Sequence, residues 1–299
     1  MKTGSRRCIT LAMKSSASTN VSTAPTFCTG YYHEPFLSLC SEVPGASVYL
    51  PSDFYVEWGP VFHRGRLDGS ARLLILGMVP TQLEIITRRI LMGDAGQRLQ
   101  GFLAKLGVVK SYVMINTFIY SIANSKAPGI YQDHPAIAAY RHAWIDALIT
   151  PEVDAVIGLG SRADAAFALW RQTTAGQRFS GAYLNIVHPT QPESAAHGNP
   201  QRLATATAAL LNNWNQALEI LHKQIRSPDE VVKLVPYGDS FISGDVRPIP
   251  SFDLPAGTPG WMGQTAMWAT RPAGDRAAKR ASITISPPRG IYNPCDGAD

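Results

Sequence analysis

Four short apolar runs, each followed by a longer amphipathic stretch, constrain the fold of this chain more than any other feature. The runs are 71–78 (ARLLILGM), 111–118 (SYVMINTF), 154–160 (DAVIGLG) and 182–187 (AYLNIV), and the stretches are 97–108, 134–149, 161–172 and 200–225. Strands that are apolar on both sides are typical of a parallel sheet covered by helices on both faces. The pattern predicts an α/β protein, a three-layer α/β/α sandwich with a central four-stranded parallel sheet and right-handed connections.

Composition divides the chain into three parts. Residues 1–45 are rich in Ser, Thr and Gly, which predicts a flexible N-terminal arm. Residues 46–225 carry the alternation and are expected to form one domain, and the Pro- and Gly-rich residues 226–299 an irregular C-terminal extension packed on or near the core. The last amphipathic stretch predicts a helix whose core face carries Leu203, Ala206, Leu210, Leu211, Trp214, Leu218 and Leu221.

Composition also limits the class of protein. No apolar run approaches the roughly 18 residues that a membrane span needs, so no membrane association is expected. A net charge of +5 and a pI near 9.0 suit a polyanionic partner. We expect a cytoplasmic monomer without metal or cofactor, with extracellular disulfides as the alternative. That expectation rests on four cysteines that lie far apart and form no C-x-x-C pair: Cys8, Cys28, Cys40 and Cys295.

The candidate site lies where the predicted strands end. Ligands of open parallel sheets bind beyond the carboxyl ends of the strands. Asn116 ends the second run, and its amide can donate and accept hydrogen bonds at once, as reading the edge of a pyrimidine requires. His188 ends the fourth run and is followed by Pro189, which favours an extended turn with the imidazole at the rim.

The segment after the third run allows a second interpretation. Residues 158–163 (GLGSRA) match the relaxed G-x-G-x-x-A motif of dinucleotide-binding folds. That motif belongs after a first strand, and the next strand should end in an acid, where His188 stands. A dinucleotide-binding enzyme is therefore the less favoured alternative. Ser161 and Asp164 instead predict a helix cap, and the exposed amides there can bind a DNA phosphate.

Taken in order, motifs within roughly residues 54–222 resemble those of the uracil-DNA glycosylase superfamily. Gly77-Met-Val-Pro80 resembles the motif G-Q-D-P or G-E-x-P, and Leu91–Leu99 resembles the stretch P-F-V-G-x-A-G-x-x-L. Asn116 matches the pyrimidine-reading asparagine, and His188-Pro189 matches the H-P motif whose histidine stabilises the departing base. The resemblance implies a uracil-DNA glycosylase-like fold. It also implies an enzyme of base excision repair that hydrolyses the N-glycosidic bond of uracil in single- or double-stranded DNA and leaves an abasic site.

The chain departs from this family at the water-activating position. Met78 and Val79 replace the acid or its polar neighbour, and Leu91 or Met92 replaces the aromatic residue that stacks on the base in many relatives. The resemblance therefore implies a divergent member, in which activity is expected to be reduced. The alternative is a catalytically silent homologue that binds uracil or abasic DNA.

The strand ends and the resemblance together assign the expected site residues. The expected catalytic residues are His188 and Glu84. Glu84 is preferred over Asp94 as the carboxylate that orients water. The substrate-binding residues are Asn116, Gly77, Met78, Val79, Pro80, Leu91 and Met92. The DNA-binding residues are Ser161, Arg162, Thr190, Gln191, Pro192 and Ser194, with Gln191 or Pro192 as a wedge in the duplex. Further candidates for phosphate contacts are Arg88, Arg89 and Arg98.

Overall fold

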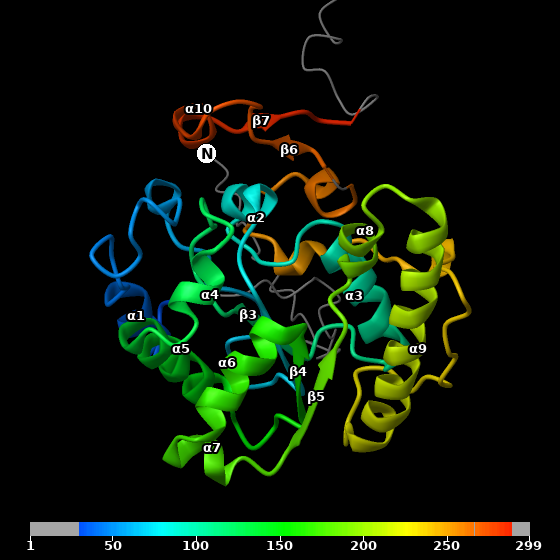
Figure 1. Ribbon diagram of the computed structural model, residues 1–299. Helices are drawn as coiled ribbons and strands as arrows, with labels where there is room; N and C mark the ends of the chain where they lie inside the picture. Colours follow the sequence, from blue (N-terminus) through cyan, green and yellow to red (C-terminus); the bar gives the residue numbers. More distant parts are fainter. Residues whose placement is uncertain (1–29, 266, 289–299) are drawn as a thin grey trace, which may run out of the picture.

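A five-stranded sheet forms the centre of the computed structural model, which describes residues 30–265 and 267–288 (Figure 1). Its strand order is β1-β3-β2-β4-β5. The four predicted strands run parallel, as β2 (Leu73–Gly77), β3 (Tyr112–Asn116), β4 (Ala155–Leu159) and β5 (Ala182–Ile186). The predicted mixed α/β class is confirmed.

The prediction of a four-stranded sheet is wrong by one strand. The fifth strand, β1 (His63–Gly65), pairs antiparallel with β3 at the edge of the sheet. Its three residues show no apolar run, because His63 and Arg64 are polar and Gly65 has no side chain. Their burial depends on partners that lie far away in the sequence.

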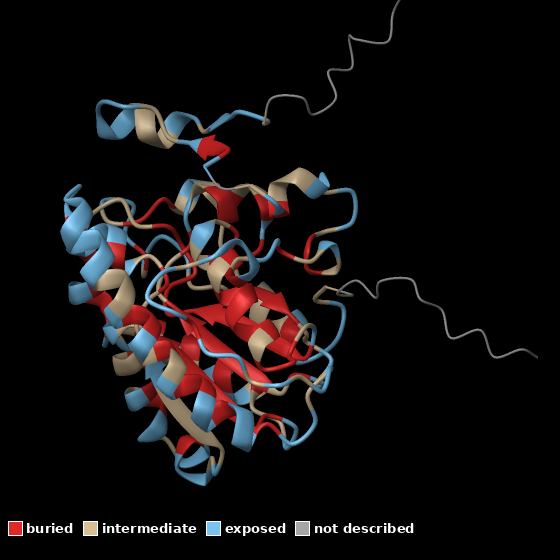
Figure 2. Ribbon diagram, turned by 90° about the vertical axis from the view of Figure 1, so that its right-hand side faces the viewer, coloured by how far each residue is buried: buried red, intermediate tan, exposed pale blue. Residues whose placement is uncertain are grey.

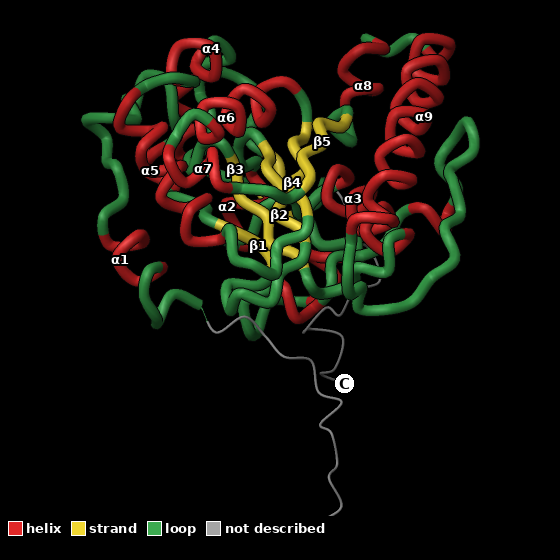
Figure 3. Tube along the Cα trace, turned by 90° about the horizontal axis from the view of Figure 1, so that it is seen from below, coloured by secondary structure: helices red, strands yellow, loops and turns green. Residues whose placement is uncertain are grey.

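Helices cover both faces of the sheet and produce three layers (Figure 3). The helices α3 (Asp94–Lys105) and α9 (Pro200–Gln224) lie on one face, and α5 (Pro135–Leu148) and α6 (Ser161–Arg171) lie on the other. The shorter elements are α1 (Phe36–Ser41), η1 (Val56–Trp58), α2 (Gln82–Thr87), α4 (Ala127–Tyr131), α7 (Thr174–Arg178), α8 (Gln191–Ala196), η2 (Ser243–Asp245), η3 (Ser251–Asp253), η4 (Gly260–Gly263), β6 (Ala269–Thr270), α10 (Arg276–Ala281) and β7 (Thr284–Ile285).

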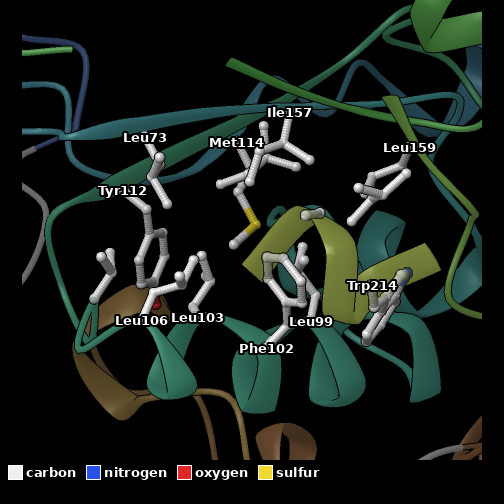
Figure 4. Close-up of a cluster of buried hydrophobic side chains, with 14 of the residues drawn as sticks. Leu73, Leu99, Phe102, Leu103, Leu106, Tyr112, Met114, Ile157, Leu159 and Trp214 are labelled. Carbon is white, nitrogen blue, oxygen red and sulfur yellow. The ribbon is translucent and has the colours of Figure 1, made fainter. Parts of the chain in front are cut away.

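Alternation along β2 explains why its sequence is apolar throughout. Leu73 and Ile75 point to the layer of α3 and α9, whereas Leu74 and Leu76 point to the layer of α5 and α6. The strands β2, β3 and β4 are buried throughout, and β5 is partly exposed. Figure 2 shows buried strands in the centre and exposed outer faces of the helices. Each such side chain contributes about 1.5–3 kcal/mol by its burial. Figure 4 shows the cluster of buried side chains between the sheet and the layer of α3 and α9. Its labelled side chains include Leu73, Leu99, Phe102, Met114 and Trp214.

Only part of the predicted core face of helix α9 is buried against the sheet. Trp214, Leu218 and Leu221 are buried against the sheet, as predicted, together with Leu210 and Leu211. Leu203 is 36% exposed and Ala206 is only partly covered, so the prediction of a core face is wrong for the first turns. These turns pack on α8 instead.

Both predicted extensions contact the core where they are described. Residues 1–29 and 289–299 lie outside the described part of the chain, and so do Cys8, Cys28 and Cys295; Cys40 is a free thiol. At the N-terminal side, Phe36 of α1 packs on Trp144 of α5, with ring centroids 5.5 Å apart. Among the residues that the structure describes, no helix combines the length and apolar character needed to cross a bilayer.

A buried ion pair joins the C-terminal extension to the sheet. Arg64 Nη1 lies 3.1 Å from Asp253 Oδ2, and the two side chains are 0% and 2% exposed. Arg64 also donates to the backbone O of Ile90 and to Gln100 Oε1, and the hydroxyl of Tyr112 donates to Asp253 at 2.6 Å. Both charges are therefore compensated by opposite charge and by hydrogen bonds, the condition under which buried ions are tolerated.

Replacing Asp253 with Asn should leave the Arg64 guanidinium buried without a counter-charge. We expect the free energy of unfolding to fall by about 3–5 kcal/mol in urea titrations at neutral pH. The matched control is Glu152→Gln, which breaks the exposed pair with Arg72 and should cost below about 1 kcal/mol. Equal losses in the two variants would contradict the expectation.

Candidate functional site

A cavity of about 290 Å³ opens at the carboxyl ends of β2 and β3 and beside the chain that follows β5. Sequence-predicted residues that line it are Met78, Val79, Glu84, Leu91, Asn116, His188 and Thr190. Its other lining residues are Thr81, Gln82, Leu83, Gly93, Asp94, Ala95 and Met267. The structure thus brings the predicted imidazole and carboxamide, from separate strands, to one cavity.

A larger groove, of about 810 Å³, adjoins this cavity. The two share Met78, His188 and Thr190 in their walls. The groove brings together most of the predicted DNA-binding residues, namely Ser161, Arg162, Thr190, Gln191 and Ser194. Its far wall comes from the projecting turns of α9, with Ala206, Ala209 and Leu210.

Asn116 is held across the end of the neighbouring strand. It lies opposite Gly77, where a Cβ atom would come within 2.3 Å of Asn116 Oδ1, so the glycine makes room for the amide. The backbone N–H groups of Thr117 and Phe118 donate to the backbone O atoms of Gly77 and Met78, each at 2.9 Å. These bonds fix the two strand ends against each other.

The amide nitrogen of Asn116 is a buried polar atom without a partner in the described part of the chain. Asn116 is 5% exposed, and its Nδ2 has no hydrogen-bond partner within the described residues. Buried amide donors are nearly always hydrogen-bonded in native proteins, because an unpaired donor costs about 1–3 kcal/mol. A ligand with an acceptor oxygen at this position would supply the partner.

Helix α9 positions His188. The backbone N–H of Val187 donates to Asn213 Oδ1, and Trp214 Nε1 donates to the backbone O of Val187, each at 2.9 Å. His188 Nδ1 accepts the backbone N–H of Thr190 at 3.3 Å. Burial lowers the pKa of His188, so the ring is neutral at pH 7. In the tautomer in which Nδ1 accepts from Thr190, the proton lies on Nε2. His188 is therefore a neutral hydrogen-bond donor.

Three arginines near the cavity form hydrogen bonds that hold neighbouring loops in place. Arg98 of α3 donates to the backbone O of Pro189 at 2.7 Å and pairs with Glu193 at 2.6 Å. Arg88 and Arg89 donate to backbone O atoms as well, of Trp58 and Asp253 respectively. Their guanidinium groups hold the loops around the cavity. Of the four arginines considered, only Arg162 lines the groove.

Glu84 joins the two loops that flank α2. One carboxylate oxygen accepts the N–H of Thr81 in a capping box, and the other accepts the N–H of Leu91. Burial raises the pKa of Glu84 to about 7, although these N–H groups act in the opposite direction. The contacts give Glu84 a positioning role, and its part in orienting a water stays a prediction.

The loop that contains Leu91 lies very close to α3, and a glycine in that helix makes this approach possible. Leu91 has φ of 55°, in the left-handed region. Its carbonyl O lies so close to Gly96 of α3 that a Cβ atom there would stand 1.5 Å away. The glycine in the predicted G-x-A-G stretch therefore allows close approach of the loop to the helix.

Asp94, the second carboxylate considered, is placed differently from Glu84. It is the first residue of α3, it is exposed, and it lines the cavity. Its carboxylate accepts no hydrogen bond from any other described residue. A water in the cavity can therefore donate to it without displacing a protein contact.

Several predicted residues do not line the cavity or groove. Met92 is fully buried in a cluster with Trp268 and Leu254, so Leu91 is the residue of this pair that reaches the cavity. Gly77 and Pro80 are buried and shape the strand end without lining the cavity. Thr190 precedes α8, and the next residues lie in this helix, where Pro192 is buried and Gln191 and Ser194 are exposed. Pro192 therefore presents no wedge to a duplex, because its ring faces the interior.

The predicted helix cap at the third strand end is also wrong. Gly160, with φ of 78°, precedes the first residue of α6, and Ser161 makes no cap. Asp164 instead accepts the hydroxyl of Tyr183 at 2.8 Å. Gly160, and not Ser161, occupies the N-cap position, because only a residue without Cβ adopts this conformation at low cost.

Met267 is a cavity residue that sequence reasoning missed. It comes from the C-terminal extension, is 66% exposed and has φ of 61°. No motif surrounds it, and only the packing of β6 on α2 brings it to the rim. Within residues 30–265 and 267–288, no group of three or more potential metal-ligating side chains occurs.

Neither a scan against protein-family models nor a search of curated proteins found a match to this chain. The cavity, the groove and the side chains that line them are therefore the features that indicate a function. The cavity is lined by Asn116, whose amide donor is buried and unpaired, and by His188, whose imidazole is neutral. Together they suit a planar polar ring that gains negative charge.

The lowered pKa of His188 predicts how stability depends on pH. An imidazole in the unfolded chain titrates near pH 6.5, so on acidification the unfolded state takes up this proton first and stability is lost. His188→Gln removes this titration. Between about pH 7.5 and pH 5.5 the wild type should therefore lose more free energy of unfolding than the variant. Parallel urea titrations measure the difference, and a difference that is constant with pH would contradict the expectation.

Proposed function

We propose that this protein is a uracil-DNA glycosylase with a uracil-DNA glycosylase-like fold, acting in base excision repair. The observation that carries the proposal is that Asn116 and His188 line one cavity. In addition, Asn116 Nδ2 is buried without a hydrogen-bond partner among the described residues. The order of motifs within residues 54–222 supports the same function. In this reaction the bond between uracil and deoxyribose is hydrolysed and an abasic site remains.

The dimensions of the site favour a single base as ligand. At about 290 Å³, the cavity stands at the small end of ligand pockets, which span about 300–1,000 Å³. A base inside a duplex would reach it only after swinging out, which costs a few kcal/mol. The adjoining groove, with Arg162, Gln191 and Ser194 in its walls, would hold the flanking strand. A dinucleotide fits this cavity less well.

His188 and Asn116 would act on the leaving group. As the bond from the sugar C1′ to the base N1 breaks, its electron pair moves onto the uracil ring, and positive character develops on the sugar. Nε2–H of His188 and Nδ2–H of Asn116 would donate to the two ring oxygens. Each well-placed donor of this kind lowers the barrier by about 3 kcal/mol. A neutral imidazole can donate without first being protonated.

Asp94 would orient the attacking water. Met78 and Val79 offer no polar side chain, and both oxygens of Glu84 already accept backbone N–H groups. Asp94 lines the same cavity and is exposed. The water oxygen bonds to C1′, and its proton passes to the carboxylate and then to solvent. The released uracil anion takes a proton from solvent.

An oligonucleotide with one uracil, incubated with the protein and then treated with alkali, should show strand scission. We expect His188→Ala and Asn116→Ala each to reduce the rate by about 10²–10³-fold, because each removes one donor to the leaving group. His33→Ala, at an exposed histidine, is the matched control and should leave the rate unchanged. An abasic product that forms at the wild-type rate with His188→Ala would refute the assigned role.

Two further outcomes separate the alternatives. Tight binding of the uracil oligonucleotide by the wild type, without scission, would replace the proposal with a silent homologue that binds uracil or abasic DNA. The absence of both scission and binding would overturn the proposed glycosylase and the silent homologue alike. In the binding arm, a matched oligonucleotide with thymine in place of uracil reports binding that does not depend on the lesion.

Asp94→Asn should reduce the single-turnover rate about 100-fold while affinity for the oligonucleotide is unchanged, since the carboxylate acts on water. Glu84→Gln should instead lower the thermal midpoint, because it removes an acceptor from the cap or from the Leu91 loop. A loss of rate in Glu84→Gln at unchanged stability, with Asp94→Asn fully active, would assign the water to Glu84.

A further inference from the structure

The cavity of about 290 Å³ has two residues with a left-handed backbone in its wall. Among the described residues other than glycine, positive φ occurs at Arg88, Leu91, His197 and Met267. Leu91, with φ of 55°, and Met267, with φ of 61°, both line the cavity. A residue with a Cβ adopts this conformation at a cost, and such residues gather at binding sites, where the surrounding structure enforces them.

A buried neighbour holds the backbone at Met267. Trp268, the next residue, is 2% exposed and packs in one cluster with Leu83 and Met92. Its Nε1 donates to the backbone O of Met262 at 3.1 Å. The strand β6, which begins two residues after Met267, lies against α2 (Figure 1). Because Leu83 of α2 also lines the cavity, Met267 is attached directly to the cavity wall.

The side chain of Met267 itself is not used for packing. It is 66% exposed although it is apolar, and within the described residues it is not among the side chains that pack on the Trp268 cluster. The wall next to it is apolar as well, with Val79 and Leu91. A methionine side chain is flexible, and its thioether makes favourable contacts with aromatic rings. A planar ring in the cavity would therefore remove apolar surface of Met267 from water.

We propose that Met267 covers the base that enters the cavity and thereby sets the affinity for it. The inference rests on the proposed function, because it takes uracil as the ligand. It gives a role to a residue of the C-terminal extension, outside the residues 54–222 that carry the resemblance. Asn116 and His188 can donate only to the edge of the ring, so its faces need apolar contacts. A contact of this kind is present before and during bond cleavage, and it acts on affinity rather than on the rate of the chemical step.

Met267→Gly removes the side chain and suits the left-handed backbone, so the thermal midpoint should stay within about 2 °C of the wild type or exceed it. In single-turnover assays, we expect the concentration that gives half-maximal scission to rise about 10-fold at an unchanged maximal rate. Met267→Leu, with an apolar side chain of similar volume, should restore the wild-type value. Ile242→Ala is the matched control, because it shortens an apolar side chain of the same extension that is 67% exposed.

Free uracil, added as an inhibitor, separates contact with the base from contact with the DNA strand. Met267→Gly should raise the uracil concentration for half-inhibition by the same factor of about 10. A change for the oligonucleotide alone, with inhibition by uracil unchanged, would assign Met267 to the strand and overturn the inference.

Three other results have different consequences. An active Met267→Gly variant with unchanged half-saturation and unchanged inhibition would overturn the role of Met267 and leave the glycosylase intact. If the wild type binds the uracil oligonucleotide without scission, the 10-fold change is measured as a loss of binding affinity, and its absence would overturn the inference. A wild type with neither scission nor binding would overturn the proposed function and this inference with it.

Discussion

The ion pair between Arg64 and Asp253 is the interaction on which the rest of this structure depends. Arg64 stands on the edge strand β1, and its guanidinium reaches the carbonyl of Ile90, the side chain of Gln100 on α3 and the carboxylate in η3. Ile90 immediately precedes Leu91, which lines the cavity of about 290 Å³. The Arg64–Asp253 pair thus helps to fix the position of the loop that contributes Leu91 to the cavity wall.

Two kinds of residue build the candidate site. Asn116, His188 and Asp94 line the cavity, and other residues, of which Glu84 also lines it, hold the backbone around it. Glu84 ties the start of α2 to the Leu91 loop, and Arg98 holds the carbonyl of Pro189, next to the imidazole. Such contacts keep the donors in place before a ligand arrives, as the proposed reaction would require.

The sequence predicts those parts of the fold whose burial follows from local periodicity. The four parallel strands and their long helices appear within three residues of the predicted ends, because an apolar strand needs cover on both faces. Asn116 and His188 could be placed because strand ends meet at one edge of a sheet. The strand β1 and Met267 could not, since their burial and position depend on contacts between distant segments. Nor could Leu91 be chosen over Met92, because a left-handed backbone decides which side chain turns toward the cavity.

The long separation within the Arg64–Asp253 pair affects the order in which a nascent polypeptide can mature on the ribosome. Arg64 is translated 189 residues before its carboxylate partner. All five strands of the central sheet are therefore synthesised while this guanidinium still lacks its counterion. Vectorial synthesis delivers the sheet first and the C-terminal segment that neutralises its buried cation afterwards. The final consolidation of the interior therefore follows the synthesis of the whole sheet.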